Sequence, residues 1–266
     1  MTESQNVTLR VEDGIATVCL NDPLRLNPLT FRSYAELERM MLDFQKDPSV
    51  DVVIITGKGR GFCSGGSVDK IIAKLLQMPA EDLYRFTRMS CNVVANMRRL
   101  AKPIVAAVNG IAAGAGAMLA LASDLRLASE RAKFAFLFVK VGLAGADMGA
   151  CHLLPQIVGR GKASELLFLG ETISADEALR IGLANRVVPH ERLMDEALSL
   201  SKRLQNGPLH AIGVTKQLLN NEATMSLEAA LEMESNAQAL CMQTRDFREG
   251  HDAFMEKRKP KFNRGS

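Results

Sequence analysis

One acid in a stretch of small and apolar residues is the first candidate for chemistry. Residues 142–155 read GLAGADMGACHLLP, and Asp147 is the only carboxylate among them. Removal from water raises the pKa of a carboxyl group towards the pH at which a general acid or base works. We therefore predict that Asp147 transfers protons in an apolar pocket. The alternative is that Asp147 caps the helix that begins near Met148, and the two roles are compatible.

Two glycine-rich segments are the next candidates. GFCSGGSVD (61–69) follows the β-branched run 51–56, and NGIAAGAGAM (109–118) follows the apolar run 103–108. Glycine and alanine leave backbone N–H groups uncovered, so two facing segments could hold one oxyanion between them. The same glycines would also permit tight packing of strands on helices, and the sequence leaves this alternative open. A dinucleotide site is not favoured, because GAGAML lacks the last glycine of GxGxxG.

The elements around these segments indicate an α/β fold. A hairpin turns at Glu12-Asp13-Gly14, and a helix follows a cap at Thr30. Strand-like runs at 51–56, 103–108, 125–129 and 132–138 then alternate with helical segments, and from about residue 161 helices dominate. This order predicts an α/β core over residues 1–200 and a helical C-terminal region over residues 201–266. The glycine segments lie where strands end and helices begin, which is where such sheets bind ligands.

Composition narrows the class of protein. The chain has 266 residues, 47% of them hydrophobic and 24% charged, with a net charge of +3. This charge is too small to indicate nucleic-acid binding, although it suits an anionic small molecule. The five cysteines are scattered without a CxxC pair, which disfavours disulfides and zinc and fits a cytoplasmic location. The histidines share no metal-ligand spacing. The longest apolar stretch, near 104–123, is interrupted by Asn109 and glycines, so we predict no membrane span.

Several segments together resemble the crotonases, the enoyl-CoA hydratase/isomerase superfamily. These are DPLRLNPLT (22–30), GFCSGGSVD (61–69), KPIVAAVNGIAAGAGAMLALASDLRLAS (102–129), ISADEALRIGLANRVVP (173–189) and AFMEKRKPKF (253–262). The resemblance implies a spiral of ββα turns with a helical C-terminal trimerisation region, and trimers that often stack into hexamers. It also implies a coenzyme A thioester as substrate, with no separate cofactor. Its enolate would be held by the backbone N–H groups of Gly66 and Ala115.

The resemblance also suggests residues that contact coenzyme A. Arg25 matches a basic position that often touches the phosphates or the adenine. Lys257 matches a C-terminal lysine that often reaches coenzyme A from a neighbouring subunit. Ser64 in the first glycine segment is a further candidate. For each of them the alternative is a solvated charge or a loop turn. Ser67 stands where many relatives have Asp, with Asp69 two positions later, so the resemblance does not carry over a contact that needs an acid at position 67.

The sequence departs from the hydratases at both glutamates that activate water. By motif position, Met118 and Phe138 replace them, and neither side chain can transfer a proton. Some crotonase isomerases instead carry a carboxylate in the turn of Asp147, and a related dehalogenase uses it as a nucleophile. We therefore predict an isomerase or lyase that shifts a double bond, or adds or removes water, in an unsaturated acyl-CoA such as one with an aromatic or alicyclic group, and we favour the isomerase reaction. Met118, Phe138 and Tyr84 would line the acyl pocket. The alternatives are a nucleophilic Asp147 that carries out substitution or hydrolysis, and a silent acyl-CoA-binding protein.

Overall fold

The computed structural model describes residues 6–262 and shows two sheets that the chain builds in turn. The large sheet has the order β1-β2-β3-β5-β7-β10, and the small sheet has the order β4-β6-β8-β9. From β3 to β8, each turn of the chain gives one strand to each sheet, and a helix follows the first two turns. The predicted spiral of ββα turns is confirmed. The strands are β1 (Val7–Glu12), β2 (Ile15–Leu20), β3 (Val52–Gly57), β4 (Gly61–Cys63), β5 (Ile104–Val108), β6 (Ile111–Ala113), β7 (Leu125–Ser129), β8 (Lys133–Ala135), β9 (Thr172–Ser174) and β10 (Arg186–Val188).

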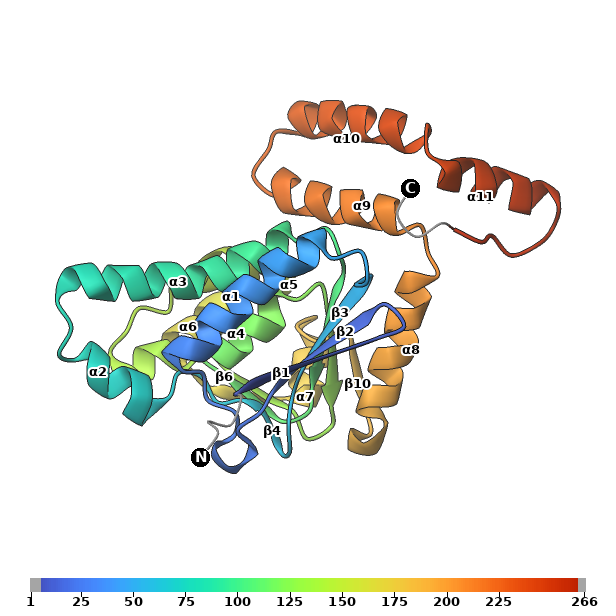
Figure 1. Cartoon of the computed structure of the whole chain (residues 1–266). Helices are drawn as coiled ribbons and strands as arrows, with labels where there is room; N and C mark the ends of the chain where they lie inside the picture. Colours follow the sequence, from blue (N-terminus) through green and yellow to red (C-terminus); the bar gives the residue numbers. More distant parts are fainter. Residues whose placement is uncertain (1–5, 263–266) are drawn as a thin grey trace.

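Helices cover both faces of the large sheet (Figure 1). In β3, Val53 and Ile55 face one apolar core, while Val52 and Ile54 face a second core under α8. Burial on both faces explains the unbroken β-branched run of this strand. The α-helices are α1 (Phe31–Lys46), α2 (Ala73–Leu75), α3 (Ala80–Arg99), α4 (Ala115–Ala122), α5 (Ala150–Val158), α6 (Arg160–Leu169), α7 (Ala175–Arg180), α8 (Leu193–Gln205), α9 (Leu209–Glu222), α10 (Leu227–Cys241) and α11 (Arg245–Met255). Short helices of other types are η1 (Pro23–Arg25), η2 (Val68–Ile72), η3 (Leu137–Val141) and η4 (His190–Arg192).

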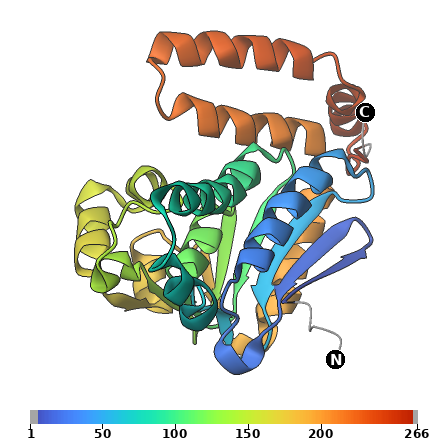
Figure 2. The ribbon, with the colours of Figure 1, turned by 60° about the vertical axis from the view of Figure 1, so that its left-hand side comes forward.

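The C-terminal helices form an arm that extends from the core (Figure 2). The arm consists of α9, α10 and α11, and none of the residues of α10 is buried. The boundary expected after residue 200 falls inside α8, whose residues Leu193 and Ala197 belong to the core under the large sheet. The structural transition from core to arm therefore lies a few residues later, after Gln205.

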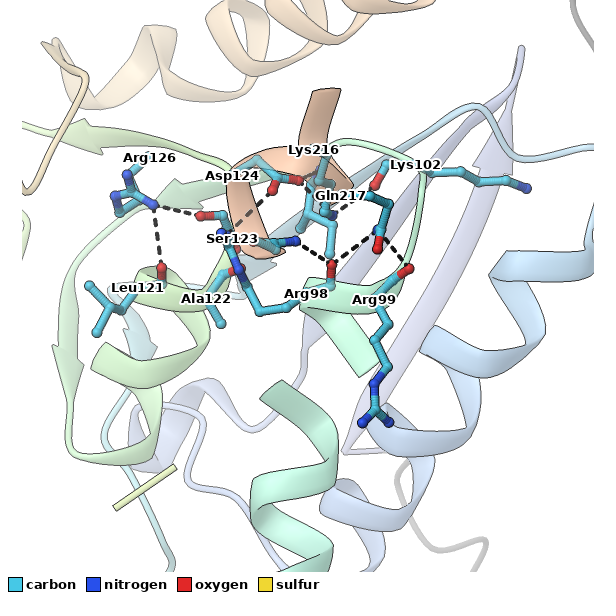
Figure 3. A network of polar contacts seen from close by, with 12 residues as sticks. Arg98, Arg99, Lys102, Leu121, Ala122, Ser123, Asp124, Arg126, Lys216 and Gln217 are labelled. Atoms are coloured by element: carbon cyan, nitrogen blue, oxygen red, sulfur yellow. Dashed lines mark hydrogen bonds and ion pairs between the residues drawn. The ribbon is translucent and has the colours of Figure 1, made fainter. Parts of the chain in front are cut away.

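A network of charged side chains attaches α9, the first helix of the arm, to the core (Figure 3). Lys216 of α9 is 6% exposed, and its Nζ lies 2.8 Å from Oδ2 of Asp124. The same ammonium group donates to the carbonyl oxygen of Lys102 at 3.1 Å. Arg98 of α3 lies on the other side of Asp124, with Nη1 3.5 Å from Oδ1. Burial lowers the pKa of Lys216, and the charge of Asp124 opposes this shift. The network therefore joins α9 to the ends of α3 and α4.

Candidate active site

The first glycine segment leaves one backbone donor free. The N–H of Gly65 bonds to the thiol of Cys63, and its carbonyl oxygen accepts from the N–H of Leu29 at 2.7 Å. The N–H of Ser67 donates back to the carbonyl oxygen of Leu29 at 2.8 Å. None of the hydrogen bonds found among residues 6–262 uses the N–H of Gly66. This N–H is therefore held in place by its neighbours and is available to a ligand.

The second donor lies at the start of α4. The N–H of Gly114 donates to the carbonyl oxygen of Ala135 at 2.8 Å, which ties the turn to β8. Gly114 has φ 50° and ψ −120°, a conformation that is essentially restricted to glycine. Ala115 is the first residue of α4, and the first N–H groups of a helix have no partner within it. The N–H of Ala115 is therefore at the positive end of the helix dipole and suits an anion.

The two segments face each other across a short distance. A Cβ atom built on Gly65 would lie 3.8 Å from the N atom of Ala115. A Cβ atom built on Gly114 would lie 3.9 Å from Cα of Gly65 and 3.9 Å from Cε1 of Phe138. A Cβ atom on Gly116 would lie 2.2 Å from a backbone oxygen of β4, so this glycine permits the close approach of α4. The fold thus brings the segments of both predicted donors together, with an aromatic ring beside them.

Asp147 lies in the turn between η3 and α5. The N-cap of α5 is Gly149 and no side chain caps this helix, so the alternative that Asp147 caps it is wrong. The Asp147 carboxylate is half-buried and accepts a hydrogen bond from the N–H of Met148. Burial raises the pKa of Asp147, and this hydrogen bond opposes part of the rise. The environment shifts the pKa in the direction that a proton-transferring carboxylate needs.

The two residues that the resemblance matches to the glutamates of hydratases, Met118 and Phe138, are both buried. Met118, on the second turn of α4, has no exposed surface, and Phe138 is 6% exposed. The prediction of a strand over residues 132–138 was wrong at its C-terminal end. The strand β8 stops at Ala135, and Phe138 lies in η3. The reason is that β6 and β9 offer only three residues each for pairing with β8. Phe138 still lies beside Gly114, so its position borders the oxyanion segments.

A second tyrosine, which the sequence analysis did not single out, lies close to these groups. Tyr34 in the first turn of α1 is 3% exposed, whereas the predicted pocket residue Tyr84 is 64% exposed on α3. The pKa of Tyr34 lies well above its ordinary value, first because of burial and then because of electrostatic interactions with the acidic groups of Cys63 and Asp147. The apolar spacing of α1 was a usable signal, because Tyr34 shares its buried stripe with Leu37. The role predicted for Tyr84 stays a prediction.

Two of the three residues predicted to contact coenzyme A lie at the first glycine segment. Arg25 forms an ion pair with Asp69, and its Nη2 donates to Oγ of Ser67 at 3.5 Å. Ser67 and Arg25 together hold the pKa of Asp69 well below its ordinary value. Oγ of Ser64 donates to the carbonyl oxygen of Arg25 at 3.3 Å. Lys257 is exposed and follows the last residue of α11 by two positions. Contact of these residues with coenzyme A stays a prediction.

Residues 6–262 contain no group of three or more His, Cys, Asp or Glu side chains that could hold a metal ion. Within that range, no helix is both long and apolar enough to cross a membrane.

Comparison with known proteins identifies the family. The family model for enoyl-CoA hydratase/isomerase matches residues 10–265. A 1,2-epoxyphenylacetyl-CoA isomerase from Escherichia coli (strain K12) is 38% identical over 254 residues, which cover 95% of this chain and 96% of the relative. A crotonyl-CoA hydratase from Syntrophomonas wolfei is 34% identical over 259 residues, covering 97% and 98%. The crystal structure of a candidate enoyl-CoA hydratase from Streptomyces coelicolor A3(2) superposes with a TM-score of 0.95 at 46% identity, covering 99% of this chain and 96% of that one. The chain therefore belongs to the enoyl-CoA hydratase/isomerase family of the crotonase superfamily.

Proposed function

We propose that this protein is an acyl-CoA isomerase that moves a double bond through a thioester enolate. The observation that supports the proposal is the half-buried Asp147, whose pKa is raised by burial. By the resemblance, the buried side chains of Met118 and Phe138 take the positions of the two glutamates of a hydratase. A similar relative bears the name of an epoxyphenylacetyl-CoA isomerase, which supports an aromatic or alicyclic acyl group.

In this mechanism the two backbone donors act on the thioester oxygen. Negative charge grows on this oxygen as a proton leaves the adjacent carbon, and the N–H groups of Gly66 and Ala115 stabilise it. Loss of one such donor typically lowers the rate by about 10²–10³-fold. Hydrogen bonds of the neighbouring backbone groups hold both donors in place. Little reorganisation is therefore needed when negative charge develops on the thioester oxygen.

Asp147 moves the proton in this mechanism. Its carboxylate takes a proton from one carbon of the acyl group and returns it to another, so the double bond shifts and no atom is gained or lost. Burial disfavours the charged form of Asp147, which makes it a stronger base than an exposed aspartate. Hydration would require a group that positions and deprotonates water, and the apolar side chains of Met118 and Phe138 cannot do this.

The proposal is tested with a panel of 2-enoyl, 3-enoyl, dienoyl and ring-unsaturated CoA esters in D₂O. We expect a shifted double bond with deuterium uptake and no added water in at least one ester. Asp147→Asn should reduce this turnover by about 10²–10⁴-fold, the usual contribution of a general acid or base. Full activity of Asp147→Asn on every accepted ester would refute the proton transfer. A covalent adduct on Asp147, detected by mass spectrometry, would instead indicate the nucleophilic alternative.

We also propose that the chain assembles as a homotrimer or as a hexamer of two trimers. The arm supports this, because α10 buries none of its residues and exposes the apolar side chains of Leu227, Leu231 and Leu240. Such a surface is normally covered by a partner. Assembly would also allow Lys257 to approach the site of a neighbouring subunit. Light scattering after size-exclusion chromatography tests this, and a monomer at micromolar concentration would contradict it. The five free thiols support a reducing, cytoplasmic location.

A further inference from the structure

We propose that the side chain of Met148 closes the acyl site against a cavity between α3, α5 and α9, and that it thereby limits the length of the acyl group. This inference rests on the proposed function, because it assumes that the acyl group reaches Asp147. It adds a residue that selects substrates by size, directly beside the residue that moves the proton.

A cavity of about 340 Å³ lies between these three helices. Its volume is within the usual range for small-molecule pockets, roughly 300–1,000 Å³. Val94 and Ala95 of α3 line it together with Leu153 of α5. A Cβ atom built on Gly149, in the turn before α5, would lie 3.9 Å from Cγ1 of Val94 and 3.8 Å from Cδ1 of Leu153. The turn that carries Asp147 therefore reaches the wall of this cavity.

The interior of the cavity suits a hydrocarbon chain, because its polar lining groups already have protein partners. Arg98 donates a hydrogen bond to Oδ1 of Asn220. The side chains of Gln156 and His152 hydrogen-bond to each other at 3.1 Å. The thiol of Cys91 behaves as a small apolar group. A strongly polar ligand would have to break these bonds, whereas an alkyl chain would bury apolar surface without doing so.

Met148 lies between this cavity and Asp147. It follows Asp147 directly in the chain, and its N–H bonds to the Asp147 carboxylate. Its side chain lines the cavity and is only 1% exposed, so it is packed on its remaining sides. It belongs to the same apolar core as Phe138, which borders Gly114 of the second glycine segment. An acyl group that extends past Asp147 towards α3 and α5 would therefore meet the Met148 side chain before the cavity.

The backbone of Met148 indicates that a side chain is needed at this position. Met148 has φ 48°, in the left-handed region that residues with a Cβ atom rarely adopt, and Gly149 follows it with φ 86°. A glycine at position 148 would fit this backbone better. Strained residues persist where the surrounding structure holds them, and they cluster at functional sites. The flexible methionine side chain fills the space between the two apolar regions, which a glycine could not do.

The test measures binding of esters that have no double bond to move. Dissociation constants of butanoyl-, hexanoyl-, octanoyl- and decanoyl-CoA are measured by calorimetry for the wild type and for Met148→Gly. We expect the wild-type affinity to rise with chain length only up to a limit, and this limit to lie at a longer ester in Met148→Gly. Each further buried methylene group increases affinity about fourfold. Relative to butanoyl-CoA, the variant should therefore bind the longest ester about tenfold more tightly than the wild type does.

A second substitution fills the cavity from the side of α3. Ala95→Leu in the Met148→Gly background should abolish the gain for longer esters, because the added side chain occupies the cavity. Ala35→Leu, at an exposed position of α1, is the matched control and should keep the gain. In the wild-type background, Ala95→Leu should leave the chain-length limit unchanged, because Met148 already closes the cavity.

Three results would refute the inference. The first is a wild-type chain-length limit in Met148→Gly, and the second is a gain that survives Ala95→Leu. The third is a shorter limit in Ala95→Leu alone, because the cavity would then already hold the acyl chain of the wild type. Thermal unfolding verifies that each variant is folded, and Met148→Ala repeats the comparison with the backbone conformation left as strained as in the wild type.

This experiment separates the inference from the proposed function. Binding is measured without turnover, so a chain that isomerises no ester can still show the shifted limit. Conversely, isomerase activity with an unchanged limit in Met148→Gly would retain the proposed function and reject the role of Met148.

Discussion

Replacement of Gly116 by alanine tests how closely the oxyanion site depends on packing. The added Cβ atom would lie 2.2 Å from the carbonyl oxygen of Cys63 and 2.7 Å from its Cβ atom. An ordinary contact is roughly 3.5 Å, so α4 and β4 must separate by about 1 Å. The obstacle is backbone, which cannot rotate away as a side chain can. We therefore expect a loss of about 3 kcal/mol in the free energy of unfolding, at the upper end of typical overpacking.

The same separation should impair the reaction. Ala115 is adjacent to Gly116, and Gly66 follows β4 by three residues, so a shift of α4 from β4 pulls the two donors apart. A misplacement of about 1 Å typically lowers turnover by about 10²-fold. We expect kcat to fall to this extent in Gly116→Ala, with a smaller change in KM, because the donors act mainly on the enolate.

Gly161→Ala is the matched control. Gly161 is likewise the second residue of a helix, α6, and a Cβ atom there would meet no atom within 4 Å. This variant should keep wild-type activity and gain up to about 1 kcal/mol, because alanine favours the helix. Urea unfolding and steady-state kinetics on an accepted enoyl-CoA measure both effects. Wild-type stability and kcat in Gly116→Ala would refute the reasoning.

Three further predictions concern charged groups. Burial raises the pKa of Asp147 above its unfolded value, so its contribution to stability is present at low pH and is lost as pH rises through the folded pKa. Asp147→Asn should therefore be more stable than the wild type in urea at pH 7.5, and this advantage should vanish near pH 3. Lys216→Met removes the closer of the two ion-pair partners that Asp124 has among the described residues, Lys216 and Arg98. It should therefore cost about 1–3 kcal/mol and speed proteolysis near residues 206–208, and an unchanged digestion rate would contradict this. Arg25→Ala should raise KM several-fold for CoA esters but not for pantetheine esters, with kcat unchanged; equal effects on both would exclude a phosphate contact.

The sequence predicted the local features of this protein well. The hairpin turn at Asp13-Gly14, the Thr30 cap and the β-branched strand 52–57 follow from short-range preferences, which the residues themselves carry. The crotonase resemblance added the order of the elements and the candidate donors Gly66 and Ala115. Asp147 could be chosen because a lone acid among small apolar residues is visible without a structure.

Long-range contacts could be seen only in the fold. The end of β8 depended on the lengths of β6 and β9, which lie far from it in sequence, so the strand expected to Phe138 ended early. Tyr34 and Tyr84 have the same side chain in helices of similar character, yet one is buried near Asp147 and the other is exposed. Burial depends on which helix face meets the rest of the chain. The sequence thus determined the family, the two glycine segments and the candidate acid Asp147. Tertiary packing decided which side chains share a site and how their pKa values shift, because desolvation and charge act through space and not along the chain.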